Sequence, residues 1–198
     1  MMNPSPTIGV LALQGDFAEH AAMLARLGAT VREVRLPEEL EGLDGLVLPG
    51  GESTTIGKLA TDYGLIEPLR QFGQSKAIYG TCAGAIFLSK DAERSQPLLG
   101  IMDITVERNA YGRQVESFDV QVPVPALNGL AAGDPPVRAV FIRAPLIKSV
   151  SGEATSLASL PDGRIIAAQQ GKLLATAFHP EISGDDRFHR YFLKLAES

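Results

Sequence analysis

Short apolar runs alternate with amphipathic segments through roughly the first ninety residues of the chain. Each apolar run is followed by glycine or polar residues, which is typical of a buried strand. The segments between them carry apolar residues at helical spacing, and Gly28 is expected to end the first helix. The expected strands are Thr7–Leu13, Thr30–Leu36, Gly45–Leu48 and Ala77–Tyr79, and the expected helices are Phe17–Leu27, one that begins near Thr54, Ile66–Phe72 and Ala83–Leu88. This alternation predicts a parallel sheet with both faces covered.

The second half of the chain changes character, with strand patterns and few helical ones. A hairpin is expected where Gln-Gln-Gly-Lys separates two apolar runs, and a proline- and glycine-rich stretch predicts a long surface loop. The expected strands are Ile101–Arg108, Gln114–Val124, Val137–Arg143, Arg164–Ala168 and Leu173–Phe178, the loop is Val122–Pro136, and the closing amphipathic helix is Asp185–Leu195. We expect one α/β domain over residues 1–198, with a core from about 7 to 195, built as a three-layer sandwich around a mostly parallel sheet.

Composition narrows the classes of function. The chain has 198 residues, 45% of them hydrophobic and 21% charged, which is ordinary for a soluble globular protein. A net charge of −5 gives no basic surface for nucleic acid, and no apolar run approaches the ~20 residues of a membrane span. The single cysteine cannot form an internal disulfide, and no signal-peptide pattern precedes the first strand. We therefore expect a cytoplasmic protein that binds neither nucleic acid nor membrane.

The single cysteine, Cys82, lies between Gly80 and Gly84 at a predicted strand-to-helix turn. This spacing is typical of a nucleophile elbow, in which a sharp turn holds the reactive side chain at the carboxyl end of the sheet. The N–H of Ala83 would then face a developing oxyanion, and the helix N-terminus would favour a thiolate. A small buried side chain in a glycine-rich turn is the alternative, and the motif alone leaves both open.

His179 is the strongest candidate for a base among the three histidines of the chain. It follows an apolar strand and begins His-Pro-Glu, so Glu181 can reach the imidazole and set its tautomer. The other two, His20 and His189, lie in the first and last predicted helices, where we expect exposed or half-buried positions. A loop histidine at a strand end is the alternative for His179. Together with Cys82, however, the order nucleophile, base and orienter favours catalysis.

A glycine pair in Pro49–Ser53 supplies a further possible part of the site. The segment follows a predicted parallel strand, where ligands bind in open α/β sheets. Its glycines let backbone amides face a ligand, which makes the N–H of Gly51 a candidate second oxyanion donor. A plain turn is the alternative. No Lys-Ser/Thr pair follows, so the segment is not a phosphate-binding loop.

The motifs PGGES, GTCAG and HPE resemble those of class I, triad-type glutamine amidotransferases. Many of those proteins have glutamine where this chain has Ile86. The glutaminase subunits of pyridoxal 5′-phosphate synthase are the branch that the chain resembles from Ile8 to about Leu195. The matching segments are Leu11–His20, Pro49–Thr54, Gly80–Leu88, Glu107–Phe118, Phe141–Pro145 and Ala177–Glu181.

The resemblance implies a flavodoxin-like fold and hydrolysis of L-glutamine to glutamate and ammonia, with no cofactor and no metal. The ammonia would pass to a (β/α)8-barrel synthase subunit that makes the vitamin B6 cofactor. Cys82 would be the nucleophile, His179 the base and Glu181 its orienter. An α-amino acid needs charged and carbonyl partners, although surface ion pairs are the alternative for the arginines. The residues implied to contact glutamine are Gly50, Gly51, Glu52, Arg108, Ile142 and Arg143.

Control by the partner is also expected, because a free glutaminase would waste glutamine. The polar segment Gln14–His20 starts at the edge of the sheet that bears the site, so we expect Gln14 to touch the synthase and help to set the Gly51 amide. Two other classes stay open. One is a peptidase- or deglycase-like enzyme that uses an acid from the first loop, such as Asp16. The other is a scaffold protein without activity. Ammonia release from glutamine separates the three.

Overall fold

The structure is a computed structural model that describes residues 5–108 and 117–198. Its central sheet contains β1 (Thr7–Leu11), β2 (Thr30–Val34), β3 (Gly45–Leu48), β4 (Ala77–Thr81), β5 (Ser89–Asp91), β6 (Met102–Glu107), β9 (Leu146–Val150), β10 (Thr155–Ser159), β11 (Ile165–Gln170) and β12 (Leu173–Thr176). Within the described residues these ten strands run in the order β2-β1-β3-β4-β12-β11-β9-β6-β5, and β10 pairs with β11.

One half of the sheet is parallel and determines where a site can form. β2, β1, β3, β4 and β12 all pair in parallel, with Leu48 opposite Gly80 and Thr176 opposite Thr81. The carboxyl ends of β1, β3, β4 and β12 therefore meet at one edge, where the loops that begin near residues 12, 49, 82 and 177 converge. Beyond β12 the pairing turns antiparallel through β11 and β9, and β5 pairs with β6 in parallel. The predicted hairpin is confirmed as β11 and β12.

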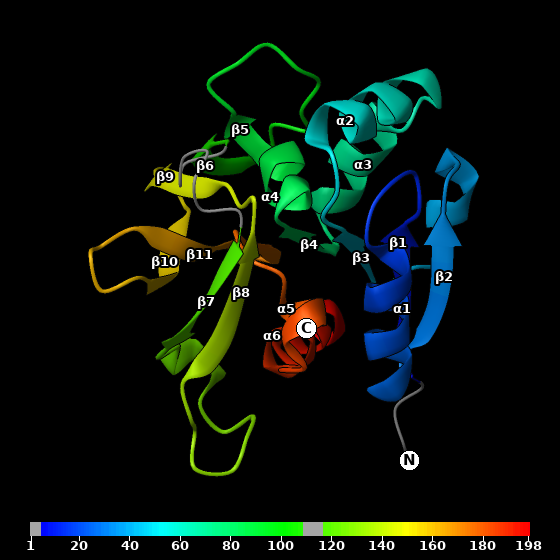
Figure 1. The fold of residues 1–198 in the computed structure, drawn as a ribbon. Helices are drawn as coiled ribbons and strands as arrows, with labels where there is room; N and C mark the ends of the chain where they lie inside the picture. The colour runs from blue at the N-terminus through cyan, green and yellow to red at the C-terminus, as the bar shows by residue number, and fades with distance from the viewer. Residues whose placement is uncertain (1–4, 109–116) are drawn as a thin grey trace.

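Helices cover both faces of this sheet (Figure 1). One face packs against α2 (Ser53–Asp62), α3 (Ile66–Gly73) and α4 (Ala83–Leu88). The other packs against α1 (Phe17–Arg26), α6 (Arg187–Glu197) and the separate two-stranded sheet of β7 (Ser117–Val122) and β8 (Val137–Ile142). The predicted α/β sandwich is confirmed in these layers. No helix in the described ranges is both long and apolar enough to cross a membrane.

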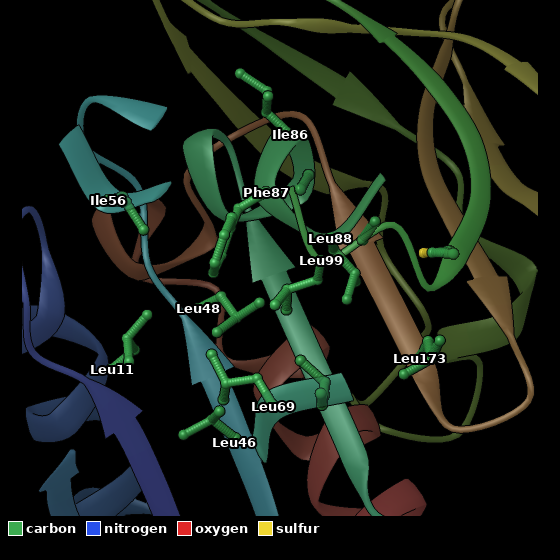
Figure 2. Close-up of a cluster of buried hydrophobic side chains, with 14 of the residues drawn as sticks. Leu11, Leu46, Leu48, Ile56, Leu69, Ile86, Phe87, Leu88, Leu99 and Leu173 are labelled. Carbon is green, nitrogen blue, oxygen red and sulfur yellow. The ribbon is translucent and has the colours of Figure 1, made fainter. Parts of the chain in front are cut away.

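The strand β3 shows why its sequence is apolar throughout. Leu46 and Leu48 point into the cluster under α2, α3 and α4, whereas Val47 belongs to the cluster on the opposite face. Figure 2 shows Leu48 next to Phe87 of α4 and Leu46 next to Leu69 of α3. All of these side chains are almost completely buried, and each contributes roughly 1.5–3 kcal/mol by leaving water. This packing gives the loops at the carboxyl edge a rigid base.

The short and half-exposed elements differ from the sequence expectation. β5, β9 and β10 were not predicted, because exposed polar residues such as Lys148 and Ser156 interrupt their apolar pattern. The turn α5 (Pro180–Ser183) is too short to show a helical period. The loop predicted over residues 122–136 contains a short 3-10 turn, Pro125–Leu127. The predicted strand from Gln114 is described only from Ser117 onward, and residues 114–116 lie outside the described residues.

Candidate active site

Cys82 stands at a sharp turn between β4 and α4. Its φ of 49° and ψ of −108° are unusual for a residue with a side chain, and strain of this kind is common at reactive residues. The Cys82 N–H donates to the Thr176 carbonyl of β12 over 2.8 Å. Gly84 lets the turn close, because a Cβ there would lie 1.9 Å from the Leu48 carbonyl oxygen of β3. The strand-turn-helix geometry of an elbow is therefore present.

His179 and Glu181 lie beside this turn, between β12 and α5. The imidazole Nδ1 of His179 is 2.7 Å from Glu181 Oε1, and both residues are buried. Pro180 begins α5, so the carboxylate of its first turn points back at the histidine. The His179 backbone N–H donates to the Val140 carbonyl of β8 over 2.8 Å and fixes the residue from the other side.

The charge state of His179 follows from its neighbours. Burial opposes a charged imidazole, but hydrogen bonding with Cys82 and Glu181 and the charges of both outweigh burial and raise the pKa of His179 to about 10. The imidazole is therefore protonated at neutral pH. A protonated imidazole beside a cysteine is placed to donate a proton to a group that leaves during acyl transfer.

A cavity of about 120 Å³ opens in front of Cys82. It joins the elbow to the loop after β3 and to two arginines that follow β6 and β8, which are Arg108 and Arg143. Arg143 has a positive φ of 44°, a second strained position at this edge. The sequence predicted site roles for five of the lining residues but for three of them, Ser53, Ile86 and Pro145, it predicted none. The lining residues are Gly51, Ser53, Cys82, Ala83, Ile86, Arg108, Arg143 and Pro145.

Three predicted glutamine contacts do not line the cavity. Glu52 caps α2 by accepting from the Thr55 N–H at 2.8 Å, and it also accepts from Arg108 Nη2 at 3.0 Å. Burial opposes its charge, but hydrogen bonds from Thr54 and Thr55 prevail and lower the pKa of Glu52 to about 2. Gly50 packs against the imidazole of His179, and Ile142 is 40% exposed at the end of β8. Glu52 thus acts on the cavity by holding Arg108.

The side chains of the wall that sequence reasoning missed carried different signals. Ser53 belongs to the PGGES motif, and its hydroxyl accepts from Gln96 Nε2 at 3.2 Å. Gln96 also accepts from Arg108 Nη1 at 3.4 Å. Ile86 occupies the second turn after the elbow, so its helical spacing from Cys82 could have pointed to it. Pro145 ends the matching segment Phe141–Pro145. Gln96 gave no signal, because only the folded chain brings it to this edge.

The loop after β1 contacts the loop after β3 directly. Gln14 Oε1 accepts from the Glu52 N–H at 2.7 Å, and the Asp16 N–H donates to the Gly50 carbonyl at 3.0 Å. Between them Gly51 has a φ of 153°, and a Cβ there would lie 2.4 Å from Gln14 Oε1. The backbone that carries the candidate oxyanion donor is therefore held by Gln14.

The expectation for His20 and His189 was wrong. Both side chains are completely buried, because α1 and α6 pack on the same face of the sheet. His20 Nδ1 is 2.8 Å from His189 Nε2, and His20 Nε2 is 3.0 Å from Thr81 Oγ1. Burial lowers the pKa of both histidines, that of His189 to about 4, so both are neutral at pH 7.

Asp16 adds a third polar group at His179. Its Oδ2 is 3.5 Å from His179 Nδ1, compared with 2.7 Å for Glu181 Oε1. Ligand atoms of Asp16, His179 and Glu181 lie within 4.8 Å of one another and could hold a metal ion. The 2.7 Å separation is a hydrogen-bond length, however, and a protonated imidazole does not bind metal. The geometry favours Glu181 over Asp16 as the hydrogen-bond partner.

Known proteins were compared with this chain. The family model of the SNO glutamine amidotransferase family matches residues 10–198. Pyridoxal 5'-phosphate synthase subunit PdxT of Roseiflexus sp. (strain RS-1) is 53% identical, over 96% of this chain and 100% of that one. The subunit of the same name from Herpetosiphon aurantiacus is 55% identical, with the same coverage.

Solved structures agree with this result. A crystal structure of a glutamine amidotransferase is 49% identical with a TM-score of 0.88, and the match covers 96% of this chain and 99% of that one. The structure of PurLQS from Thermotoga maritima is 15% identical with a TM-score of 0.71, over 96% and 99%, and shows the fold alone. The flavodoxin-like class I fold expected from the sequence is confirmed. The chain belongs to the SNO glutamine amidotransferase family.

Proposed function

We propose that the chain hydrolyses L-glutamine to L-glutamate and ammonia and supplies the ammonia to a pyridoxal 5′-phosphate synthase subunit for vitamin B6 synthesis. The observation that carries this proposal is the juxtaposition of the Cys82 elbow and the His179–Glu181 pair at the edge of the sheet, beside a cavity that contains two arginines. Nucleophile, proton carrier and orienter are the parts that acyl transfer requires. The names of the close relatives support the same reaction and partner.

In the proposed reaction the Cys82 thiolate attacks the side-chain carbonyl carbon of glutamine. The carbonyl oxygen becomes an oxyanion, which the N–H groups of Gly51 and Ala83 stabilise. His179 then donates its proton to the side-chain nitrogen of glutamine, and the C–N bond breaks. Ammonia departs, and a γ-glutamyl thioester remains on Cys82. Neutral His179 next takes a proton from water, whose oxygen attacks the thioester and releases glutamate and Cys82. Glu181 keeps the imidazole in one orientation and stabilises its charged form.

Glutamine would be recognised through its α-carboxylate and α-ammonium groups. Arg108 and Arg143 lie in the wall of the cavity and supply the positive charge that a carboxylate needs. The carboxylate of Glu52, ionised at neutral pH, lies beside Arg108 and can attract an ammonium group. We also retain Gly50 and Ile142 as candidate contacts, since both border the same edge.

The partner is proposed to be a (β/α)8-barrel synthase that docks on the edge containing Gln14. Gln14 contacts Glu52 and Gly51, so contact at the loop after β1 would reach the oxyanion donor through one side chain. Because Cys82 is a free thiol, we propose that the complex acts in the reducing cytoplasm. The activity of the free subunit should then be low.

Ammonia release from glutamine tests the function, measured with and without the synthase, for wild type and Cys82→Ala. We expect release that the synthase stimulates and that the variant lacks. A diazo-ketone analogue of glutamine should add one label per chain, seen by intact mass, and none to Cys82→Ala. Labelling that persists in the variant would contradict the role of Cys82. Release of ammonia without any stimulation would contradict control by the partner.

A further inference from the structure

A buried polar chain extends behind the site and is not used by the proposed reaction. It begins at Glu181, whose Oε1 bonds His179 while its Oε2 faces His20 Nε2 at 3.4 Å. It continues from His20 to Thr81 at 3.0 Å and to His189 at 2.8 Å. These residues come from α5, α1, β4 and α6. His179 is 5% exposed and Glu181 is 8% exposed, and the other residues of this network are completely buried.

The hydrogen bonds among these buried side chains are consistent with two tautomers of His20. The burial of the remaining nitrogen of His189 decides between the two tautomers. In one, His20 Nδ1–H donates to His189 Nε2, and His189 must then carry its proton on Nδ1. That atom is buried without a hydrogen-bond partner, and a buried N–H without an acceptor is costly. In the other, His189 Nε2–H donates to His20 Nδ1, and only a bare nitrogen is left unpaired. The second arrangement places a proton on His20 Nε2.

The proton on His20 Nε2 faces a carboxylate oxygen that has no hydrogen-bond partner among the described residues. Glu181 Oε2 is buried and makes no hydrogen bond of good geometry, although a buried carboxylate requires donors to keep its charge. His20 Nε2 lies 3.0 Å from Thr81 Oγ1 and 3.4 Å from Glu181 Oε2, so its N–H is within reach of that oxygen. We propose that His20 is a positioning residue, which holds the Glu181 carboxylate aligned on His179 and is itself fixed in the Nε2–H tautomer by His189. This inference rests on the proposed function of Glu181.

Charged and titratable groups of every neighbouring element bear on this arrangement. Tyr79 of β4 lies edge-on to the His189 ring at 5.7 Å and bonds Thr176. Asp186, before α6, and Arg26 of α1 act on the charge of His189 in opposite directions. Burial is the largest effect and lowers the pKa of both His20 and His189. Both rings are thus neutral, and each has one donor and one acceptor nitrogen.

The tautomer can be measured without any activity assay. The chain contains only three histidines, so histidine labelled with ¹⁵N gives a simple imidazole spectrum at pH 7. Spectra of His20→Gln and His189→Gln assign the signals. We expect His20 to carry its proton on Nε2 and to show a coupling to the protonated nitrogen of His189. A proton on Nδ1 of His20 would overturn the proposal.

Kinetics in the complex with the synthase test the consequence for Glu181. His20→Leu removes the donor, whereas His20→Gln keeps an N–H at a similar distance. We expect His20→Leu to lower kcat by roughly 10- to 100-fold, the range for losing one donor to a charged group, with KM for glutamine changed less than about threefold. The loss should fall on kcat and not on KM, because a misaligned Glu181 no longer holds the imidazole of His179 in its catalytic orientation. His20→Gln should restore most of kcat.

The other outcomes also decide the question. Wild-type kcat in His20→Leu, or equal losses of activity and Tm in His20→Leu and His20→Gln, would reduce His20 to a packing role. If His20→Leu does not fold, His189→Leu tests the same chain, and we expect a smaller change in the same direction. A wild-type complex that released no ammonia would refute the proposed function, but it would leave the tautomer measurement valid.

Discussion

At the scale of single residues, the site depends on backbone positions as much as on reactive groups. Cys82 adopts a positive φ, and the turn can pack on β3 only because Gly84 has no side chain. The φ of Gly84 is not in the left-handed region, so its requirement for glycine is purely steric. A steric conflict with backbone is harder to relieve than one with a flexible side chain. Gly84 therefore determines where the Cys82 sulfur lies.

Gly84→Ala should disrupt the elbow. The new methyl group would meet the Leu48 carbonyl at 1.9 Å, so we expect a loss of about 1–3 kcal/mol in the free energy of unfolding. In the complex with the synthase, kcat should fall at least tenfold, because Cys82 moves from its place. Gly100→Ala is the control, since its site is open and only its φ of 66° adds a cost. Urea unfolding measures the stability of both variants, and ammonia release measures their activity. Equal activities would contradict the role of Gly84.

The candidate site divides clearly into what short motifs predict and what they cannot. The geometry of the elbow at Cys82 and the 2.7 Å contact between His179 and Glu181 follow from neighbouring residues, and the sequence predicted both. The burial of His20 and His189 depends on α1 lying next to α6. The two histidines are 169 positions apart in the sequence. Helical spacing shows which face of a helix is apolar, but it does not identify a partner helix for a polar side chain.

At the scale of elements, the loop after β1 links the surface to the chemistry. It donates from Asp16 to Gly50 and accepts at Gln14 from Glu52, so it holds the loop after β3 at two points. The same loop precedes α1, which carries His20 one turn further on. A partner that moved this loop could act on the Gly51 amide directly. Through these two hydrogen bonds, a movement of the loop after β1 would change the position of the candidate oxyanion donor.

Gln14→Met should weaken this link while keeping the length of the side chain. Loss of the acceptor for the Glu52 N–H leaves the Gly51 peptide less well fixed, and one oxyanion donor is worth about 10²–10³ in rate. We expect kcat in the complex to fall by roughly tenfold or more. Gln14→Glu retains the acceptor oxygen and should keep more activity than Gln14→Met. Binding of the synthase, measured separately by titration, shows whether docking or catalysis has changed. Unaltered kcat in Gln14→Met would refute the role of Gln14 in fixing the Gly51 peptide.

Elements were predictable where both faces of a strand are buried. β1, β3 and β4 read as continuous apolar runs, because helices cover them on both sides. β10 pairs with the next strand, β11, in an irregular register, and its exposed polar residues hide its apolar pattern. β9 is also partly exposed, and its pairing with the distant strand β6 determines its conformation. Local sequence does not encode a contact with a strand that far along the chain. The parallel half, which bears the site, was therefore predicted better than the antiparallel half.

At the scale of the whole molecule, the two faces of the sheet differ in kind. The face under α2, α3 and α4 is packed by aliphatic and aromatic side chains (Figure 2). The face under α1 and α6 also contains the His20–His189 pair, at the place where the two helices approach each other (Figure 1). Neutral histidines are compatible with such a core, but charged ones are not. This face should therefore make its own contribution to the pH dependence of the stability of the fold.

Acidification should destabilise the protein well before its carboxylates are protonated. The folded state lowers the pKa of His189 from 6.5 to about 4, so below pH 6.5 the unfolded chain binds a proton that the folded chain does not. Stability from this group is present above pH 6.5 and is lost as the pH falls to about 4. The shift corresponds to on the order of 3 kcal/mol, and His20, whose pKa is also lowered, adds to the slope. Urea unfolding at pH 7, 5.5 and 4.5 measures it. In His189→Leu the free energy of unfolding should change less steeply with pH, by the uptake of roughly one proton. An unchanged slope in that variant would contradict the assignment to His189.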